Sequence, residues 1–241
     1  MRRRSNGSGS NVSSVPLKLL SSMAAREVLR ELLAQYRAST ARPVTAEAAG
    51  GVDVAKRVRA GERVDVVVLA DQAIDQLIAE GRLLEGTRVD LVRSGVAIAV
   101  RAGDTHPDIS TESAVRQAVT AARTVSYSTG PSGVHLEKVF QRWGILGAIR
   151  DRIVVPPPGV PVGSLVASGA AALGFQQLSE LINLPGVEVL GPLPAAIQTI
   201  TTFSGGISVA CSDPGAARAL LDYLASAAAA DAKHRHGMEP A

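Results

Sequence analysis

Cysteine, aromatic residues and long apolar runs are all scarce in this chain. Cys211 is the single cysteine, so no intramolecular disulfide can form, and no pair of cysteines or histidines has the spacing of a zinc site. Aromatic residues make up 3% of the 241 residues, and no apolar run approaches the ~18 residues that would indicate a membrane span. We therefore expect a globular protein without a disulfide, a metal site or a membrane-inserted segment.

Strong net charge and the familiar cofactor motifs are also missing. The formal charge is +3, and the basic residues are separated along helix faces without interleaved aromatics, apart from Arg2-Arg3-Arg4. This pattern predicts no nucleic-acid partner. The glycine-rich segments match neither a P-loop nor a dinucleotide fingerprint, and no nucleophile elbow occurs, so we expect no cofactor and disfavour kinase, dehydrogenase and hydrolase functions.

The first fifteen residues lack the apolar segment that a secretory signal needs. Their arginine cluster is followed by serine, asparagine and glycine, a composition typical of a disordered leader. We interpret residues 1–15 as that leader, either native to a cytoplasmic protein or standing in place of a signal.

From Leu17 onward, short β-like runs alternate with amphipathic helical patterns, as in α/β proteins built on mostly parallel sheets. A buried strand is predicted at 65–69, and helices are predicted over 134–143, over 162–167 after an extended Pro156-Pro157-Pro158-Gly159 connection, and from Pro214 to about 229. Two strand patterns contain a break: 89–92 and 96–100 are separated at 93–95, and 200–203 and 207–211 are separated at 204–206. If the chain crosses between lobes at both breaks, residues 16–95 and 202–241 form lobe I and residues 96–201 form lobe II. One continuous sheet with the same elements is the alternative.

Four loops each follow a predicted strand and precede a predicted helix. Because ligands of open α/β sheets bind at the carboxyl ends of the strands, such loops can converge on one crevice. Helix starts there offer unpaired N–H groups to an anion. Serine and glycine also occur at helix starts simply for capping and turns, so each loop has a purely structural alternative. The loops are Ser21-Ser22-Met23, Ala49-Gly50-Gly51, residues 128–133 and residues 159–162.

The loop at 128–133 carries the strongest signal. Ser128, Thr129 and Ser132 place three hydroxyls within five residues, which is more than a turn requires, and Gly133 allows a close backbone approach. We predict an anion cradle at this loop. The residue after Val134 is His135, the single imidazole near the cradle and our candidate general base.

Several further motifs occur in a characteristic order: strand to Ser21-Ser22, Asp65-Val66-Val67-Val68-Leu69, Arg93-Ser94-Gly95, Tyr127-Ser128, Leu173-Gly174-Phe175-Gln176-Gln177, and the ending Gly237-Met238-Glu239-Pro240-Ala241. Over Leu17 to Ala241 this order resembles the molybdate-binding class of periplasmic solute-binding proteins. The resemblance implies a type II two-lobed fold with two crossover strands, a periplasmic location, an ABC transporter permease as partner, and closure over a small anion. We expect a monomer.

The resemblance also implies a ligand set by position. That set is Ser21, Ser22, Gly50, Gly51, Ser128, Thr129, Ser132, Val160, Val162, and Gln176 or Gln177. To these candidate ligand residues we add Met23 and Gly133 from the loops themselves, and Arg93 if its strand passes the cleft. Molybdate binders typically have a tyrosine hydroxyl near the position of Gln177, so the amide here is a departure. The longer hydroxyl-rich loop suggests a larger ligand than a tetrahedral oxyanion.

Two functions therefore stay open. The first is a small-anion binding protein, taking an oxyanion or a small di- or tricarboxylate. The second is a cofactor-free isomerase like the aconitate isomerase branch of the same fold, with His135 as base and Arg93 as a carboxylate partner. A third alternative is an intracellular sensor domain that binds the same anion. We rank it last because we find no helix-turn-helix segment that would support it.

Overall fold

A computed structural model describes residues 15–157 and 159–241. The predicted leader therefore lies outside the described residues except for Val15, as does Pro158 of the predicted extended Pro-Pro-Pro-Gly connection. The strands are β1 (Leu17–Ser22), β2 (Val44–Ala49), β3 (Val66–Ala70), β4 (Val89–Arg101), β5 (Val125–Tyr127), β6 (Leu173–Gln177), β7 (Val187–Pro192), β8 (Ile200–Ile207) and β9 (Glu239–Pro240).

The main helices follow the amphipathic patterns of the sequence. They are α1 (Arg26–Thr40), α2 (Gly51–Arg59), α3 (Asp71–Ala79), α4 (Glu112–Ala121), α5 (Pro131–Arg142), α7 (Val162–Ala167) and α9 (Pro214–Ala225). Shorter helical turns are η1 (Met23–Ala25), α6 (Leu146–Ile149), η2 (Arg150–Arg152), α8 (Leu178–Leu181), η3 (Ala195–Ile197), η4 (Ala227–Ala229) and α10 (Ala230–Arg235).

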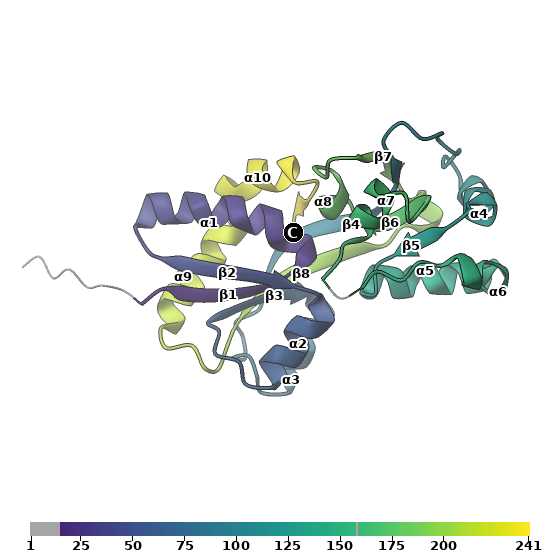
Figure 1. Cartoon of the computed structure of the whole chain (residues 1–241). Coiled ribbons are helices and arrows are strands. Elements are labelled where there is room, and N and C mark those ends of the chain that lie inside the picture. Colours follow the sequence, from purple (N-terminus) through teal and green to yellow (C-terminus); the bar gives the residue numbers. More distant parts are fainter. Residues whose placement is uncertain (1–14, 158) are drawn as a thin grey trace, which may run out of the picture.

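The elements form two lobes, as predicted (Figure 1). In lobe I, β1 pairs in parallel with β2 and β3, and β8 pairs antiparallel with β3. One apolar cluster joins this sheet to α1 and α9, and a second joins its other face to α2 and α3. In lobe II, β5 and β6 are parallel, and a third cluster packs α4 and α5 against them.

Strand β4 links the lobes. Its first half, to Gly95, pairs with β8, whereas from Val96 onward it pairs with β6 and β7. The chain returns to lobe I through β8. We keep the lobe limits at 95/96 and 201/202 as a proposal.

The predicted breaks within these crossover strands are not breaks. Arg93-Ser94-Gly95 and Ser204-Gly205-Gly206 lie inside the continuous strands β4 and β8, and the expected strand to Cys211 ends at Ile207. The glycines in β8 serve close packing instead: a Cβ on Gly205 would lie 2.3 Å from the Leu221 side chain, and one on Gly206 would lie 2.8 Å from Leu83.

Two helix ends also differ from the sequence predictions. The helix expected over Val134 to Trp143 begins three residues earlier, because Pro131 takes the first-turn position for which proline is suited. The last helix, expected to run to Ala229, ends at Ala225, and α10 follows it.

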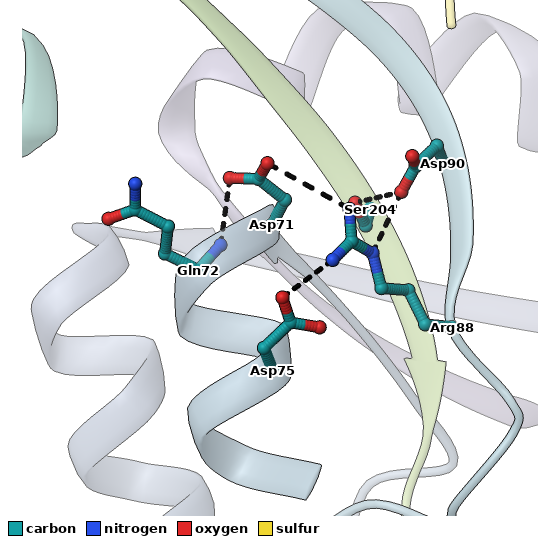
Figure 2. A network of polar contacts seen from close by, with 6 residues as sticks. All are labelled: Asp71, Gln72, Asp75, Arg88, Asp90 and Ser204. Atoms are coloured by element: carbon teal, nitrogen blue, oxygen red, sulfur yellow. Dashed lines mark hydrogen bonds and ion pairs between the residues drawn. The ribbon is translucent and has the colours of Figure 1, made fainter.

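An ion-pair network fixes lobe I beside the crossover strands (Figure 2). The Arg88 guanidinium contacts Asp75 at 2.6 Å and Asp90 at 2.9 Å, with Asp71 at 3.8 Å. Ser204 of β8 donates to Asp90 at 2.7 Å. Hydrogen bonding by Arg88, followed by Ser204, lowers the pKa of Asp90, although its burial opposes this. The network thus connects α3, β4 and β8.

Candidate functional site

A cleft of about 610 Å³ is lined by both lobes. Lobe I contributes the segments after β1, β2 and β3, and lobe II contributes residues 128–132, residues 155–157 and 159–161, and the end of β6. Thr201 and Phe203 of crossover strand β8 complete the lining. The carboxyl ends of the parallel strands therefore converge as the sequence predicted.

Several helix starts at this cleft have no side-chain cap among the described residues. Their N-cap positions include Ser22 before η1, Gly50 before α2, Gly130 before α5 and Pro161 before α7. Gly50 and Gly130 line the cleft directly, as does Met23 after Ser22. The amide groups of a first helical turn have no partner within the helix, and the positive dipole end lies there. The arrangement offers N–H donors to an anion.

Ser22 has a buried hydroxyl beside one of these helix starts. Its Oγ has no hydrogen-bond partner among the described residues, and its Cβ lies 3.9 Å from where a Cβ on Gly51 would be. Ser22 is not itself on the cleft surface. A buried unsatisfied hydroxyl has a free-energy cost, which a ligand or water reaching the Gly51 turn would relieve.

The 128–133 loop forms the opposite wall. Ser128 Oγ and Ser132 Oγ are 2.8 Å apart, and both residues line the cleft with Thr129. The loop folds so tightly on the start of α5 that a Cβ on Gly133 would lie 1.6 Å from the Ser128 carbonyl oxygen. Gly133 therefore allows the loop to pack closely on α5, but it does not itself line the cleft.

Gln176 and Gln177 line the cleft at the end of β6 but are already engaged. Gln176 Oε1 accepts from the Gly163 amide of α7 at 3.1 Å, and its Nε2 donates to Glu180 Oε1 at 2.8 Å. In the orientation that matches donors with acceptors, the Gln177 amide oxygen accepts from Thr201 and its nitrogen donates to Ser94 Oγ, both at 3.0 Å. Gln177 thus joins both crossover strands.

Few charged groups reach the cleft. Among the described lining residues Arg59 is the sole lysine or arginine, and it is paired with Glu80 through two hydrogen bonds of 2.7 and 3.0 Å. The acidic lining residues are Asp53, in the first turn of α2, and Glu180 of α8. An anion in this cleft would depend on amides and hydroxyls more than on cations.

Glu180 is the functional candidate that the sequence interpretation missed. Burial raises the pKa of its carboxyl to about 7, although the Gln176 hydrogen bond and the charge of Arg26 act in the opposite direction. Sequence spacing offered one signal: Glu180 comes four residues after Gln176, just past the end of a strand whose carboxyl end was expected at the crevice.

Most predicted ligand residues line the cleft, and several do not. The lining includes Met23, Gly50, Gly51, Ser128, Thr129, Ser132, Val160, Gln176 and Gln177. Ser21 instead lines a separate cavity of about 230 Å³ between α1 and β2, and Val162 is fully buried in the core behind the cleft.

His135 and Arg93 are not among the described residues that line the cleft. The His135 ring lies on α5 with Nε2 2.9 Å from the Ile197 carbonyl oxygen, and it is not among the lining residues. The Arg93 guanidinium donates to the Pro240 carbonyl, at 3.2 Å from Nε and 2.9 Å from Nη2. Both side chains are directed to neighbouring backbone, so the structure does not support a base at His135 or a carboxylate clamp at Arg93.

The described residues contain no group of three or more His, Cys, Asp or Glu side chains placed to hold a metal ion. Within the same residues, no helix combines the length and hydropathy that crossing a bilayer requires.

A cleft between two lobes that are joined by two crossover strands defines the type II periplasmic-binding-protein class. The chain matches the family described as bacterial extracellular solute-binding protein over residues 17–239 and belongs to it. Membership in this family implies binding of a small ligand.

Individual relatives agree with this class. The aconitate isomerase of a Pseudomonas species is 38% identical over 232 residues, which are 93% of this chain and 87% of that enzyme. The periplasmic molybdate-binding protein of Azotobacter vinelandii has a TM-score of 0.77 at 21% identity, covering 92% of this chain and 98% of its own. The sulfate-binding protein SubI of Mycobacterium tuberculosis also has a TM-score of 0.77, at 14% identity, covering 94% and 87%. At these identities the two structures show the fold alone.

Proposed function

We propose that the cleft binds a small organic anion, a di- or tricarboxylate. The observation that carries this proposal is the set of donors gathered at one cleft: the uncapped helix starts after Ser22 and Gly50 in lobe I and, in lobe II, the uncapped start of α5 with the Ser128–Ser132 hydroxyl pair. These groups are donors suited to carboxylate oxygens and require no metal.

The size and lining of the cleft favour a carboxylate over an inorganic oxyanion. Its volume of about 610 Å³ falls within the ~300–1,000 Å³ typical of sites for organic ligands. Val52, Leu69, Val155 and Phe203 add apolar contact that a carbon skeleton can use and a tetrahedral oxyanion cannot. Binding of sulfate or molybdate, for which two structural relatives are named, is the alternative that the ligand test must separate.

Thermal unfolding with single anions tests this proposal. We expect citrate and trans-aconitate to raise the melting temperature, because a ligand at 100 times its Kd stabilises the folded state by about 2.7 kcal/mol. Molybdate, tungstate and sulfate should raise it less. A Ser128→Ala/Ser132→Ala variant should lose the shift, whereas Ser39→Ala, at an exposed residue outside the cleft lining, should keep it. If no anion raises the melting temperature, anion binding is refuted.

Within this proposal the protein delivers its ligand to an ABC transporter permease, as the solute-binding family implies. Closure of the lobes over the ligand would then be the signal that the permease recognises. Small-angle scattering with and without the bound anion tests closure: we expect a smaller radius of gyration in the bound form, and an unchanged radius would argue against it.

A second candidate function is isomerisation of an unsaturated tricarboxylate. Identity of 38% to an aconitate isomerase over 93% of the chain supports it, as does an acid–base group, Glu180, in the cleft wall. Such a reaction moves a C=C bond by removing a proton alpha to a carboxylate and returning it at the other end of the allylic system. Following trans-aconitate by proton NMR with the protein tests this function, and we expect signals of the cis isomer to grow.

A further inference from the structure

We propose that Glu180 is the catalytic acid–base residue of the cleft and that Gln176 positions it. This inference rests on the isomerase function proposed above. It names the group that removes and returns the proton, a role that the sequence had suggested for His135.

The position of Glu180 is fixed by a short chain of hydrogen bonds. The Gly163 amide donates to Gln176 Oε1 at 3.1 Å, which leaves Gln176 Nε2 to donate to Glu180 Oε1 at 2.8 Å. Because the amide oxygen is held by α7, its nitrogen is directed to the carboxylate. One carboxylate oxygen is thereby restrained, and the residue lines the cleft in which a ligand would lie.

The charges around Glu180 leave it without an ion-pair partner among the described residues. Arg26, which approaches from the start of α1, is hydrogen-bonded to Glu27 at 2.9 Å. The other charged groups of the cleft lining are Asp53 and Arg59, and Arg59 is held by Glu80. A carboxyl with few neutralising contacts and a pKa near neutrality can act both as base and as acid around pH 7.

The proposed step needs no oxidant or metal, and its atoms balance. A Glu180 carboxylate oxygen takes a proton from the methylene carbon alpha to a ligand carboxylate. The C–H electron pair becomes the new C=C bond, and the original π pair moves to the far alkene carbon, where the adjacent carboxylate delocalises the charge. The Glu180 O–H bond then breaks, its proton bonds to that carbon, and Glu180 is again ionised.

The cleft walls supply what this step requires besides a base. Negative charge develops on the carboxylate next to the far carbon, and helix-start amides near Gly51 or Gly130 are donors suited to stabilise it. Asp53 is the other carboxyl of the described cleft lining and therefore the rival base.

Turnover of trans-aconitate by four variants tests the assignment. Glu180→Gln keeps the shape of the side chain and an acceptor for Gln176, and we expect its kcat to fall by about 10²–10⁴-fold. Its affinity for citrate, measured by calorimetry, should stay within a few-fold, which shows that the cleft remains folded. Glu85→Gln, an exposed acid outside the cleft lining, should keep wild-type turnover, and Asp53→Asn should lose less activity than Glu180→Gln.

The fourth variant, Gln176→Ala, tests the positioning role. The Gln176 hydrogen bond lowers the pKa of Glu180, so its loss should shift the ascending limb of the pH–kcat/KM profile to higher pH. A residue with a merely structural role would lower activity without moving that limb.

The outcomes separate this inference from the function on which it rests. If wild type isomerises trans-aconitate and Glu180→Gln does so at a similar rate, the assignment of Glu180 is overturned and the isomerase function stands. Loss with Asp53→Asn but not with Glu180→Gln would also overturn the assignment and leave the isomerase function standing. If wild type binds the anion but forms no isomer, both the isomerase function and this inference fail, while anion binding stands.

Discussion

The Arg88 network and the Glu180 site place carboxylates in two different environments within one chain. At Arg88 one guanidinium is within hydrogen-bond distance of both Asp75 and Asp90, and a lowered pKa keeps Asp90 ionised. At Glu180 the partner is a neutral amide, and burial raises the pKa to about 7. The first arrangement holds strands in place, whereas the second keeps a proton exchangeable at neutral pH. Perturbation by burial without a counter-ion is typical of functional sites.

The largest expected effect concerns the backbone of the cleft wall. Gly133→Ala would place a Cβ 1.6 Å from the Ser128 carbonyl oxygen, so the loop must move. We expect a loss of about 3 kcal/mol or more in the free energy of unfolding, together with weaker anion binding. Denaturant unfolding measures it. Gly147→Ala is the control, because nothing lies within 4 Å of its Cβ and alanine favours a helix. Equal stability of both variants would contradict the close approach.

Glu180→Gln should stabilise the protein at pH 8, opposite to its effect on turnover. The folded-state pKa is about 7 and the usual value is 4.5, so the folded state binds more protons and stability falls as pH rises through this window. At about 1.4 kcal/mol per pKa unit, the variant should gain roughly 1–3 kcal/mol at pH 8 and little at pH 4.5. Urea unfolding at both pH values measures the difference. A gain that does not depend on pH would contradict the raised pKa.

Arg88→Met removes the cation that the three acidic side chains share. The partners are partly exposed, so we expect a loss of only about 1 kcal/mol in the free energy of unfolding. Arg116→Met is the matched control, since Arg116 is exposed and its side chain has no ion pair among the described residues. Equal losses in both variants would show that the network adds nothing.

Salt should produce the smallest effect and should separate the two sites. Raising the ionic strength to about 1 M shortens the screening length to about 3 Å and should reduce the Arg88→Met difference by a few tenths of a kcal/mol. The Glu180→Gln difference at pH 8 should change less, because burial rather than charge pairing dominates it. A larger salt effect on the Glu180→Gln difference than on the Arg88→Met difference would contradict the contrast between the two sites.

Much of the fold followed from local sequence patterns. The proline-rich connection located the helix at residues 162–167, a run of apolar residues located the buried strand at β3, and strand-to-helix order predicted the α/β class. The crossover strands were predicted with breaks, because glycine in a strand also marks a bend. Only the neighbours, Leu221 and Leu83 at Gly205 and Gly206, show that packing requires these glycines.

The site was predictable by loop but not by side chain. The helix starts at Gly50 and Gly130 follow from chain order, whereas the direction of His135 depends on the phase of α5, which Pro131 sets. Glu180 was missed because its importance comes from burial and from the missing ion-pair partner. Neither property can be read from one sequence.

Calorimetric titration of trans-aconitate into the wild-type protein and into Ser128→Ala/Ser132→Ala tests the central claim most directly. Our account predicts one site per chain in the wild type and at least tenfold weaker binding in the variant, since the hydroxyl pair of the cleft wall is lost. Equal affinity in both proteins, or no binding of any small carboxylate to the wild type, would contradict it.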